Sequence, residues 1–374
     1  MSLGEHQHIN HIKQQFINLV VLKGLLIATI VCTGEPARAD DQLIVDGHVH
    51  TAGIGAGGSG CFVSKDLRDG YKFKWYLRAF GVSLEEIQTQ GDALVIERLS
   101  KRIAESEEVD QAVVLAMDGI IKADKTLDRD NTQVYIPNDF VAEQTAKYPN
   151  LIFGASVNPY REDAIERLHQ VKRQGAVLVK WIPAIMMIDP ADPTLSGFYR
   201  TLAALELPLL THVGQEKSFG HAEDHLGDPK RLKLPLDLGV TVIGAHIATT
   251  GKNDGEDNYE RLVPLFKEYP NLYTDISSLT QLNKLGYLSR ALEDGTFTDR
   301  MIYGSDWPLQ FFPLVSPWYH IGRASLGDLR GVSRLDNQWD RDVRLKRALG
   351  VPEAVFNRTA QILGVKTQAT VAEN

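Results

Sequence analysis

The sequence predicts an α/β fold in which eight parallel strands close into a TIM-like (β/α)8 barrel, and three observations lead to this prediction. The chain has 374 residues, and such a barrel needs roughly 250 residues and tolerates insertions. Short runs rich in Val, Ile and Leu alternate with longer amphipathic stretches, which is the pattern of repeated βα units. Residues able to bind a metal stand at the ends of several runs, where barrel enzymes carry their active sites.

Eight segments are expected to form the barrel, because they are short and apolar without strict alternation, as strands buried on both faces are. These strands are expected at 43–49, 111–117, 151–157, 176–182, 207–213, 240–246, 271–276 and 301–304. Apolar spacing and end signals indicate the helices between them. We expect helices at 161–174, 228–238, 259–269 and 282–292, and a helix that covers the barrel at 352–363.

Two insertions follow the first strand. Segment 51–60 (TAGIGAGGSG) is rich in glycine but lacks the GK[ST] of a phosphate-binding loop. It is expected to be either a mobile loop at the active-site mouth or a plain connector. Segment 62–92 carries several aromatic side chains and is expected either to cap the barrel or to form a contact between copies of the chain.

The first residues have the pattern of an export signal. Segment 24–33 is apolar, Lys23 precedes it, and Ala37-Arg38-Ala39 follows it like a cleavage site. We therefore expect a leader at 1–39, a barrel domain at 40–366 and a short flexible tail at 367–374. The chain would be periplasmic or secreted if the leader is cleaved, and cytoplasmic otherwise. The alternative for the apolar run is a short helix packed on the outside of the barrel.

Sequencing the N-terminus of protein made in a native-like host tests export. We expect the mature chain to begin at Asp40, because small residues at 37 and 39 match the positions that signal peptidase requires. A cytosolic protein that keeps Met1 would contradict this expectation.

Composition and charge narrow the range of partners. The net charge is −8 and no dense cluster of Lys and Arg appears, so nucleic acid is not an expected partner. The apolar run is too short for a stable membrane span. Cys32 and Cys61 form neither a disulfide framework nor a zinc-ribbon spacing. We expect a small-molecule substrate, and a homo-oligomer remains open.

Four of the 11 histidines stand at the ends of predicted strands. His48 and His50 close the first strand, His212 the fifth and His246 the sixth, while Asp306 follows the eighth. Residues two apart on a strand point to the same side, so His48 and His50 can share one ion. Imidazole and carboxylate ligands suit zinc, manganese, iron and cobalt. We expect one or two divalent ions, with zinc as the first choice.

The sequence around these residues resembles the amidohydrolase superfamily, and within it the amidohydrolase-related group called family 2. The resemblance spans 43–365 and rests on DGHVH, VLVKWIPA with IDPADP, LPLLTHVGQE, VIGAHIATTG, YTDIS, MIYGSDWPL and FNRTAQILG. It implies that His48, His50 and His212 are metal ligands. It also implies that Asp306 contacts both the metal and the attacking water. His246 would be a ligand to a second metal or an acid/base group.

Lys180 matches the position at which some members carry a carboxylated lysine that bridges two metals. An unmodified ammonium has no lone pair for a metal, so this role requires carboxylation. The alternatives are a salt bridge to Asp306 and an anchor for a substrate carboxylate. The number of metal ions therefore stays open.

Other candidates carry weaker signals. Glu216 follows His212 by four residues and could orient a histidine or be a solvated charge. Arg161, at the end of the third strand, could bind a substrate carboxylate or form an ion pair near a helix start, and Asp118 has the same standing. Trp181 could line the pocket or pack in the core.

The resemblance implies metal-dependent hydrolysis of a lactone, an amide or a carboxylic ester. The ion would acidify a water molecule, and Asp306 would accept its proton and pass it to the leaving group. The alternative is a non-oxidative decarboxylase on the same barrel, which Arg161 in the pocket and a single ion would favour. A barrel that only binds a ligand is disfavoured, because all five superfamily positions keep side chains able to do the chemistry.

Overall fold

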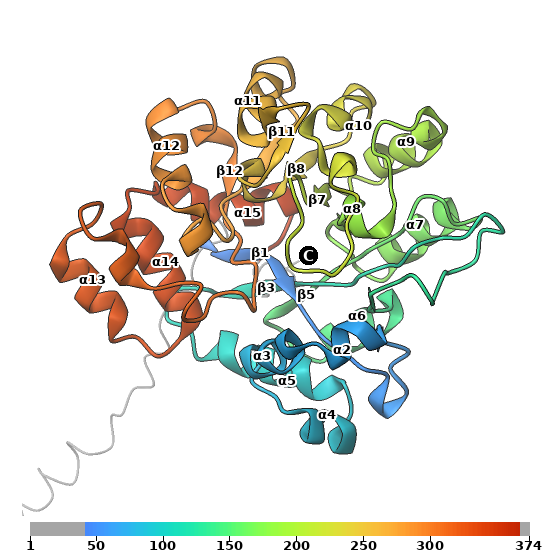
Figure 1. Ribbon diagram of the computed structural model, residues 1–374, viewed down its shortest axis with the longest axis horizontal. Coiled ribbons are helices and arrows are strands. Elements are labelled where there is room, and N and C mark those ends of the chain that lie inside the picture. Colours follow the sequence, from blue (N-terminus) through green and yellow to red (C-terminus); the bar gives the residue numbers. More distant parts are fainter. Residues whose placement is uncertain (1–41, 367–374) are drawn as a thin grey trace, which may run out of the picture. The chain divides into compact units, whose positions relative to one another are not determined.

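The computed structural model describes residues 42–366, and the expected leader and tail lie outside these residues. Eight parallel strands form the ring at the centre of Figure 1. They are β1 (Val45–His50), β3 (Gln111–Leu115), β5 (Leu151–Gly154), β6 (Val179–Trp181), β7 (Leu209–Thr211), β8 (Val242–Gly244), β11 (Leu272–Asp275) and β12 (Met301–Ile302). Seven of them lie within segments expected to be strands, and β1 extends one residue past its expected segment, so the eight predicted strand positions are confirmed.

The pairing of the strands closes the ring. Regular ladders run through β1, β3 and β5, and through β6, β7, β8, β11 and β12. Parallel bridges join these two sheets at Ala155 with Val179 and at Val49 with Trp307. At the second junction His50 N donates to Trp307 O over 3.0 Å. The sheet therefore has no free edge, as the predicted barrel requires.

Helices surround the strands (Figure 1). They are α5 (Ala93–Ala104), α6 (Asn138–Thr145), α7 (Ala164–Arg173), α8 (Pro183–Met186), α9 (Ser196–Ala204), α10 (Lys233–Asp237), α11 (Asn258–Glu268), α12 (Tyr287–Asp294), α13 (Leu326–Ser333), α14 (Gln338–Ala348) and α15 (Glu353–Leu363). Two short antiparallel pairs lie outside the ring. They are β2 (Phe62–Val63) with β4 (Val134–Tyr135), and β9 (Lys252–Asn253) with β10 (Glu256–Asp257).

Three expected helices differ from those observed. The helix expected from 161 begins at Ala164, because residues 161–163 form a turn. The helix expected at 228–238 starts as a 3-10 turn behind Asp228, whose side chain accepts from Lys230 N, and continues as α10. The segment 282–292 is divided, because Gly286 takes a φ of 91° that an α-helix cannot contain.

The inside of the barrel is apolar toward α15 and polar at the opposite end. Leu178, Leu210 and Ile302 pack in one buried cluster with Ala360 and Leu363 of α15. Side chains two residues farther along a strand point to the same side. On β6 and at the end of β7 these next side chains are Lys180 and His212, which line a cavity. Along these strands the inward-facing side chains therefore change from apolar residues in the core to polar residues at the cavity.

A bulge in β1 turns the side chains of His48 and His50 toward the inside of the barrel. The pairing of β1 with β3 shifts register between Asp46 and Val49. Before the shift Val45 belongs to the interior cluster, and after it His48 and His50 line the cavity. An extra residue in a bulge changes which side chains face inward, so the bulge brings even-numbered positions to the inside.

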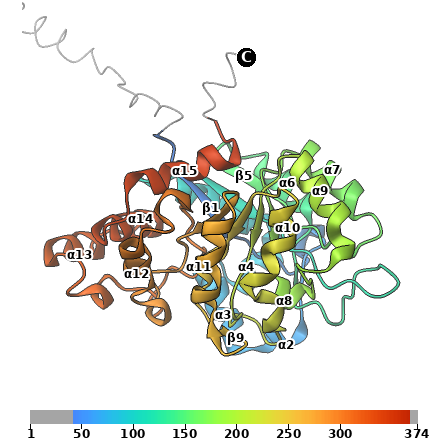
Figure 2. The same ribbon diagram turned by 90° about the horizontal axis from the view of Figure 1, so that it is seen from above.

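The insertion before α5 covers the polar end of the barrel. Figure 2 shows α2 (Lys65–Asp69) and α3 (Tyr71–Ala79) at the opposite end of the barrel from α15. They are followed by α4 (Leu84–Gln90). From this segment Phe73, Leu77 and Phe80 line the cavity. The insertion therefore caps the barrel, which was one of its two expected roles, while a contact between copies stays a prediction.

The glycine-rich segment 51–60 is tied to the start of α5. The carboxylate of Asp92 accepts from Ile54 N over 3.0 Å and from Gly55 N over 2.9 Å. Only the beginning of the segment, at Thr51, Ala52 and Gly53, lines the cavity. The segment thus borders the mouth of the barrel and connects β1 to the cap.

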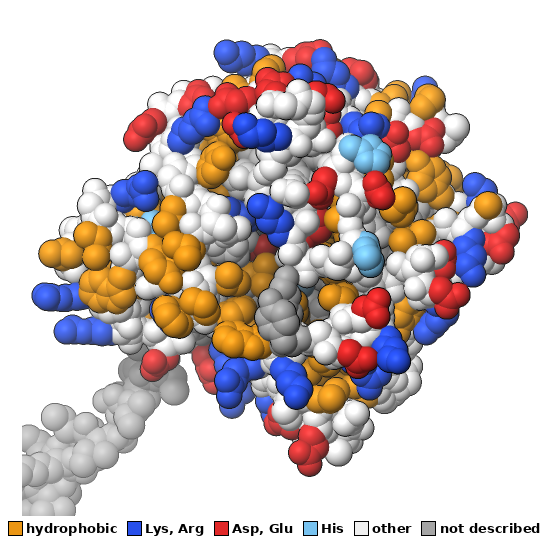
Figure 3. Space-filling model, viewed as in Figure 1, with side chains coloured by type: hydrophobic (Ala, Val, Ile, Leu, Met, Phe, Trp, Pro, Cys, Tyr) orange, Lys and Arg blue, Asp and Glu red, His pale blue; other side chains and the backbone are white. Residues whose placement is uncertain are grey.

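The surface seen in Figure 3 mixes charges of both signs, and apolar side chains gather over the region of α13. Exposed large apolar residues in this part of the chain are Phe312, Trp318, Ile321 and Leu326. Among residues 42–366, no helix is both long and apolar enough to cross a membrane.

Candidate metal centre

Three histidines and one carboxylate meet at the polar end of the barrel. His48, His246 and Asp306 each offer one ligand atom within 4.8 Å of the other two. His50 Nε2 lies 3.3 Å and His48 Nε2 lies 3.6 Å from Asp306 Oδ1, and His246 Nε2 lies 3.9 Å from Asp306 Oδ2. Imidazole nitrogens and a carboxylate gathered in this way form a donor set for a divalent transition metal.

His212 adds a nitrogen to this cluster. Its ring centroid lies 5.4 Å from that of His246. Its Nε2 is buried and has no hydrogen-bond partner among the described residues. A buried polar atom without a partner is costly, and a histidine kept for a metal presents such an atom. The donor set therefore fits a divalent ion.

The buried histidines are held in the neutral form that binds metals. Burial lowers the pKa of His48 to about 4, and the charge of Lys180 acts in the same direction. Burial also lowers the pKa of His212 and of His246. A neutral imidazole keeps a lone pair on one nitrogen, so these rings can serve as ligands near pH 7.

Asp275, at the end of β11, is the functional residue that the sequence analysis missed. Its Oδ2 accepts from His48 Nδ1 over 2.8 Å, and its Oδ1 accepts from His246 N over 2.9 Å. Burial alone would raise the pKa of Asp275, but the two histidines lower it overall. A carboxylate on Nδ1 fixes the tautomer that leaves Nε2 free for an ion. The signal was a carboxylate closing the predicted strand in YTDIS.

Lys180 reaches the nitrogen of His48 that faces the cluster. Its Nζ lies 3.0 Å from His48 Nε2. Burial lowers the pKa of Lys180 to about 8, although Asp275 and Asp306 act in the opposite direction. The side chain is therefore placed next to a candidate ligand, whereas its carboxylation stays a prediction.

Two site residues hold a backbone conformation that is rare for residues with a side chain. His246 has a φ of 58° and Asp306 a φ of 63°, in the left-handed region. Hydrogen bonds hold both backbones, since His246 N donates to Asp275 Oδ1 over 2.9 Å and Asp306 N donates to His48 O over 3.0 Å. The hydroxyl of Ser278 also donates to Asp306 Oδ2. Strained backbone of this kind concentrates at functional sites.

Gly304 lets the eighth strand approach the first. A Cβ atom at this position would lie 2.9 Å from the Cβ of His48, a distance that real side chains do not tolerate. The absence of a side chain therefore lets the backbone leading to Asp306 pass beside His48.

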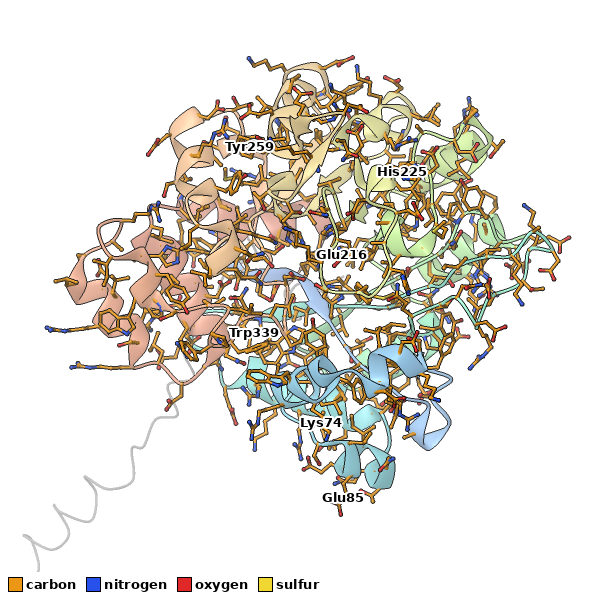
Figure 4. All side chains as sticks on the ribbon, in the orientation of Figure 1. Lys74, Glu85, Glu216, His225, Tyr259 and Trp339 are labelled. Carbon is orange, nitrogen blue, oxygen red and sulfur yellow. The ribbon has the colours of Figure 1, made fainter. Side chains whose placement is uncertain are left out.

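Glu216 lies in the cavity, near the centre of the ring in Figure 4. Its Oε2 is 3.6 Å from His212 Nδ1, and its Oε1 accepts from Ser218 N over 2.6 Å. This placement suits the expected orienting role, which stays a prediction. In the same view His225 lies away from the centre of the ring.

Two expected substrate-binding residues lie outside the described residues that line the cavity. Arg161 instead pairs with Asp118, with Nε donating to Oδ2 over 2.7 Å and Nη2 to Oδ1 over 2.6 Å. Trp181 is buried, and its ring stacks on Phe198 with centroids 5.5 Å apart. It follows Lys180 on β6, so it points to the outer face of the sheet. These contacts favour the alternatives given for the two residues, an ion pair for Arg161 and core packing for Trp181, while a substrate-binding role stays a prediction.

The cavity above the cluster has a volume of about 200 Å³. Its floor is formed by the histidines and Asp306, and the cap and neighbouring strands give it apolar walls that include Phe73, Leu77, Phe80, Met117 and Ile182. Apolar walls above a metal-binding floor suit a small organic substrate.

A closed parallel barrel with a histidine and carboxylate cluster at the carboxyl ends of its strands defines a class of metal-dependent barrel enzymes. Comparison with protein families gives the particular member: the model described as amidohydrolase matches residues 45–326, and the chain belongs to this family. It is therefore an enzyme of the amidohydrolase superfamily, as the sequence motifs predicted. No protein among those with curated descriptions matches it.

Solved structures of low sequence identity share the barrel. One is a TIM-barrel protein from Bordetella bronchiseptica, with 15% identity, a TM-score of 0.53, and coverage of 86% of this chain and 99% of that one. Another is an IDCase from Metarhizium anisopliae, with 13% identity, a TM-score of 0.50, and coverage of 86% and 97%. These similarities establish the fold.

Proposed function

We propose that the protein is a metal-dependent hydrolase that cleaves a lactone, an amide or a carboxylic ester. The observation that carries the proposal is the approach of the buried Asp306 carboxylate to three histidine nitrogens, at 3.3, 3.6 and 3.9 Å. A divalent ion held by these groups, with zinc as our first choice, would acidify a water molecule and polarise a carbonyl oxygen.

Asp306 is suited to accept the proton of that water. Burial alone would raise its pKa, but the neighbouring imidazoles of His246 and His50 hold the pKa well below its usual range. The carboxylate is therefore ionised at neutral pH and can both hold a cation and receive a proton. Because the side chain is buried beneath the cap, it can pass that proton to the leaving group in a site largely closed to bulk water.

His246 is oriented for a role beside Asp306. Its Nδ1 lies 2.7 Å from the hydroxyl of Ser277 and 3.2 Å from the Ser277 carbonyl oxygen. These contacts leave Nε2 facing the carboxylate. In that position His246 would bind a second ion, or polarise the substrate carbonyl if the site holds one ion.

The alternative is a non-oxidative decarboxylase on the same barrel. An Arg161 side chain that lined the cavity and bound a substrate carboxylate would favour this alternative. The Arg161 guanidinium instead forms two hydrogen bonds with Asp118. This placement supports the hydrolase. The count of ions remains the other discriminator.

Metal analysis joined to an activity panel tests the proposal. Purified protein would be loaded with Zn²⁺ or Mn²⁺, and assayed on an aryl lactone, an anilide, an aryl ester and aromatic acids. We expect hydrolysis of at least one of the first three, its loss on chelation and its return with metal. Release of carbon dioxide without hydrolysis would assign the decarboxylase instead, and metal-free protein with neither activity would contradict both.

A further inference from the structure

Lys284 is a buried cation in the wall of the cavity that the proposed chemistry does not use. It ends the 3-10 turn η7 (Leu282–Lys284) in the loop after β11, and only 6% of it is exposed. The turn is fixed, since Leu282 N donates to Leu314 O over 2.9 Å and Lys284 N to Gln281 O over 2.9 Å. Lys284 therefore lines the cavity from a backbone segment that hydrogen bonds fix in place.

In the part of the chain that the structure describes, the Lys284 ammonium has no close counterion. Within residues 42–366, no carboxylate lies at salt-bridge distance from it. Burial lowers the pKa of Lys284, and the opposing influence comes from Asp306, Glu216 and Asp275 at longer range. A buried charge without a close partner is costly, which indicates that this position is kept for something that enters the cavity.

The charge that supports Lys284 belongs to the candidate metal centre. Asp306 is the first of the carboxylates that favour its protonated form, and Asp306 also faces the histidine cluster. A divalent ion bound there would cancel that negative charge. With the ion in place, Lys284 would need a new counterion, and an anionic group of the substrate can supply it.

The rest of the cavity suits an apolar body attached to that anion. Phe73, Leu77 and Phe80 of the cap line one wall. Lys217, which also borders the cavity, is exposed and so has water as its partner. Lys180, the other buried lysine that lines the cavity, already contacts the candidate metal centre, with Nζ 3.0 Å from His48 Nε2. Among the described residues, Lys284 is the buried lysine of the cavity without such a contact, and an ammonium beside an apolar wall selects a molecule with one anionic and one apolar part.

We propose that Lys284 binds a carboxylate of the substrate at a point away from the bond that is cleaved. The substrate class is then an ester, a lactone or an amide that carries a free carboxylate on an apolar body. The kind of bond cleaved rests on the proposed function, whereas the binding of the carboxylate does not. Lys284 is in this view the residue that determines specificity for acids.

Calorimetric binding of phenylacetate and of its neutral counterpart phenylacetamide tests the proposal without turnover. In Zn²⁺-loaded protein, Lys284→Met should weaken phenylacetate binding by about 10–100-fold, as loss of a charge-assisted hydrogen bond does. Binding of phenylacetamide should not change. Lys284→Arg should restore most of the affinity for the acid, and Lys217→Met should have little effect. The dependence on Lys284 should be smaller after chelation, because the carboxylates of the centre then support the ammonium.

Lys284→Gln provides a second uncharged variant if the methionine variant does not fold, and melting temperatures accompany each measurement. Equal weakening of the acid and the amide, or a lower melting temperature that arginine does not restore, would assign Lys284 a structural role and overturn the proposal. Equal hydrolysis of neutral and carboxylated esters would overturn it and leave the hydrolase intact. Protein that binds phenylacetate through Lys284 yet hydrolyses nothing would support the proposal and contradict the hydrolase.

Discussion

Asp306→Asn is expected to lower turnover by about 10²–10⁴-fold while the barrel stays folded, which is the usual contribution of a general acid/base group. The amide oxygen can still face the cluster and accept from Ser278, as the carboxylate does. The amide cannot accept the proton that an ionised carboxylate accepts. The metal content should therefore remain largely intact, and kcat should carry the loss.

The measurement is kcat, metal content and melting temperature on the same preparations. Asp336→Asn is the matched control, since Asp336 is an exposed aspartate in the loop before α14, and it should leave all three unchanged. A structural Asp306 would give a lower melting temperature, with activity reduced only by the fraction unfolded. Full activity in folded Asp306→Asn would refute the role given to this carboxylate.

Strand periodicity explains how much of this site the sequence predicts. On β6 and β7, Leu178 and Leu210 face the barrel interior, so Lys180 and His212 two residues later face the same way. The same rule places Trp181 on the outer face, where it packs. Strand alternation therefore favours core packing over a place in the pocket wall for Trp181.

Other features lie beyond any strand rule. Asp46 lies where the β1 bulge begins. Its Oδ1 accepts from Ser305 N over 2.9 Å and its Oδ2 accepts from Trp339 Nε1 over 2.7 Å. Both partners are far along the chain, so no local pattern announces them. Lys284 likewise lies in a loop turn, although the apolar spacing of 282–292 predicted one helix there. Gly286 divides that segment, so that Lys284 ends the turn before α12. Loop residues reach a site through tertiary contacts, which one sequence does not display.

His48→Ala is expected to lose the metal first and activity as a consequence. His48 is buried, and its Nε2 lies 3.0 Å from Lys180 Nζ and 3.6 Å from Asp306 Oδ1. Its replacement should weaken metal binding by more than the roughly 10–100-fold that loss of an outer partner costs. Asp275→Asn should fall in that lower range, because it removes only the group that orients His48. The two variants should therefore form a graded series.

Metal titration followed by melting temperature separates this series from simple unfolding. A metal that binds only the folded protein raises its stability by an amount that grows with the ratio of metal concentration to dissociation constant. Added Zn²⁺ should therefore raise the melting temperature of wild type strongly, of Asp275→Asn less, and of His48→Ala hardly at all. His225→Ala is the control, since His225 is exposed and lies away from the centre of the ring; it should respond like wild type. If His48→Ala kept its zinc and its response to zinc, other residues would have to form the metal centre. The short distances from Asp306 to the surrounding histidines would then not predict which variant loses metal before activity.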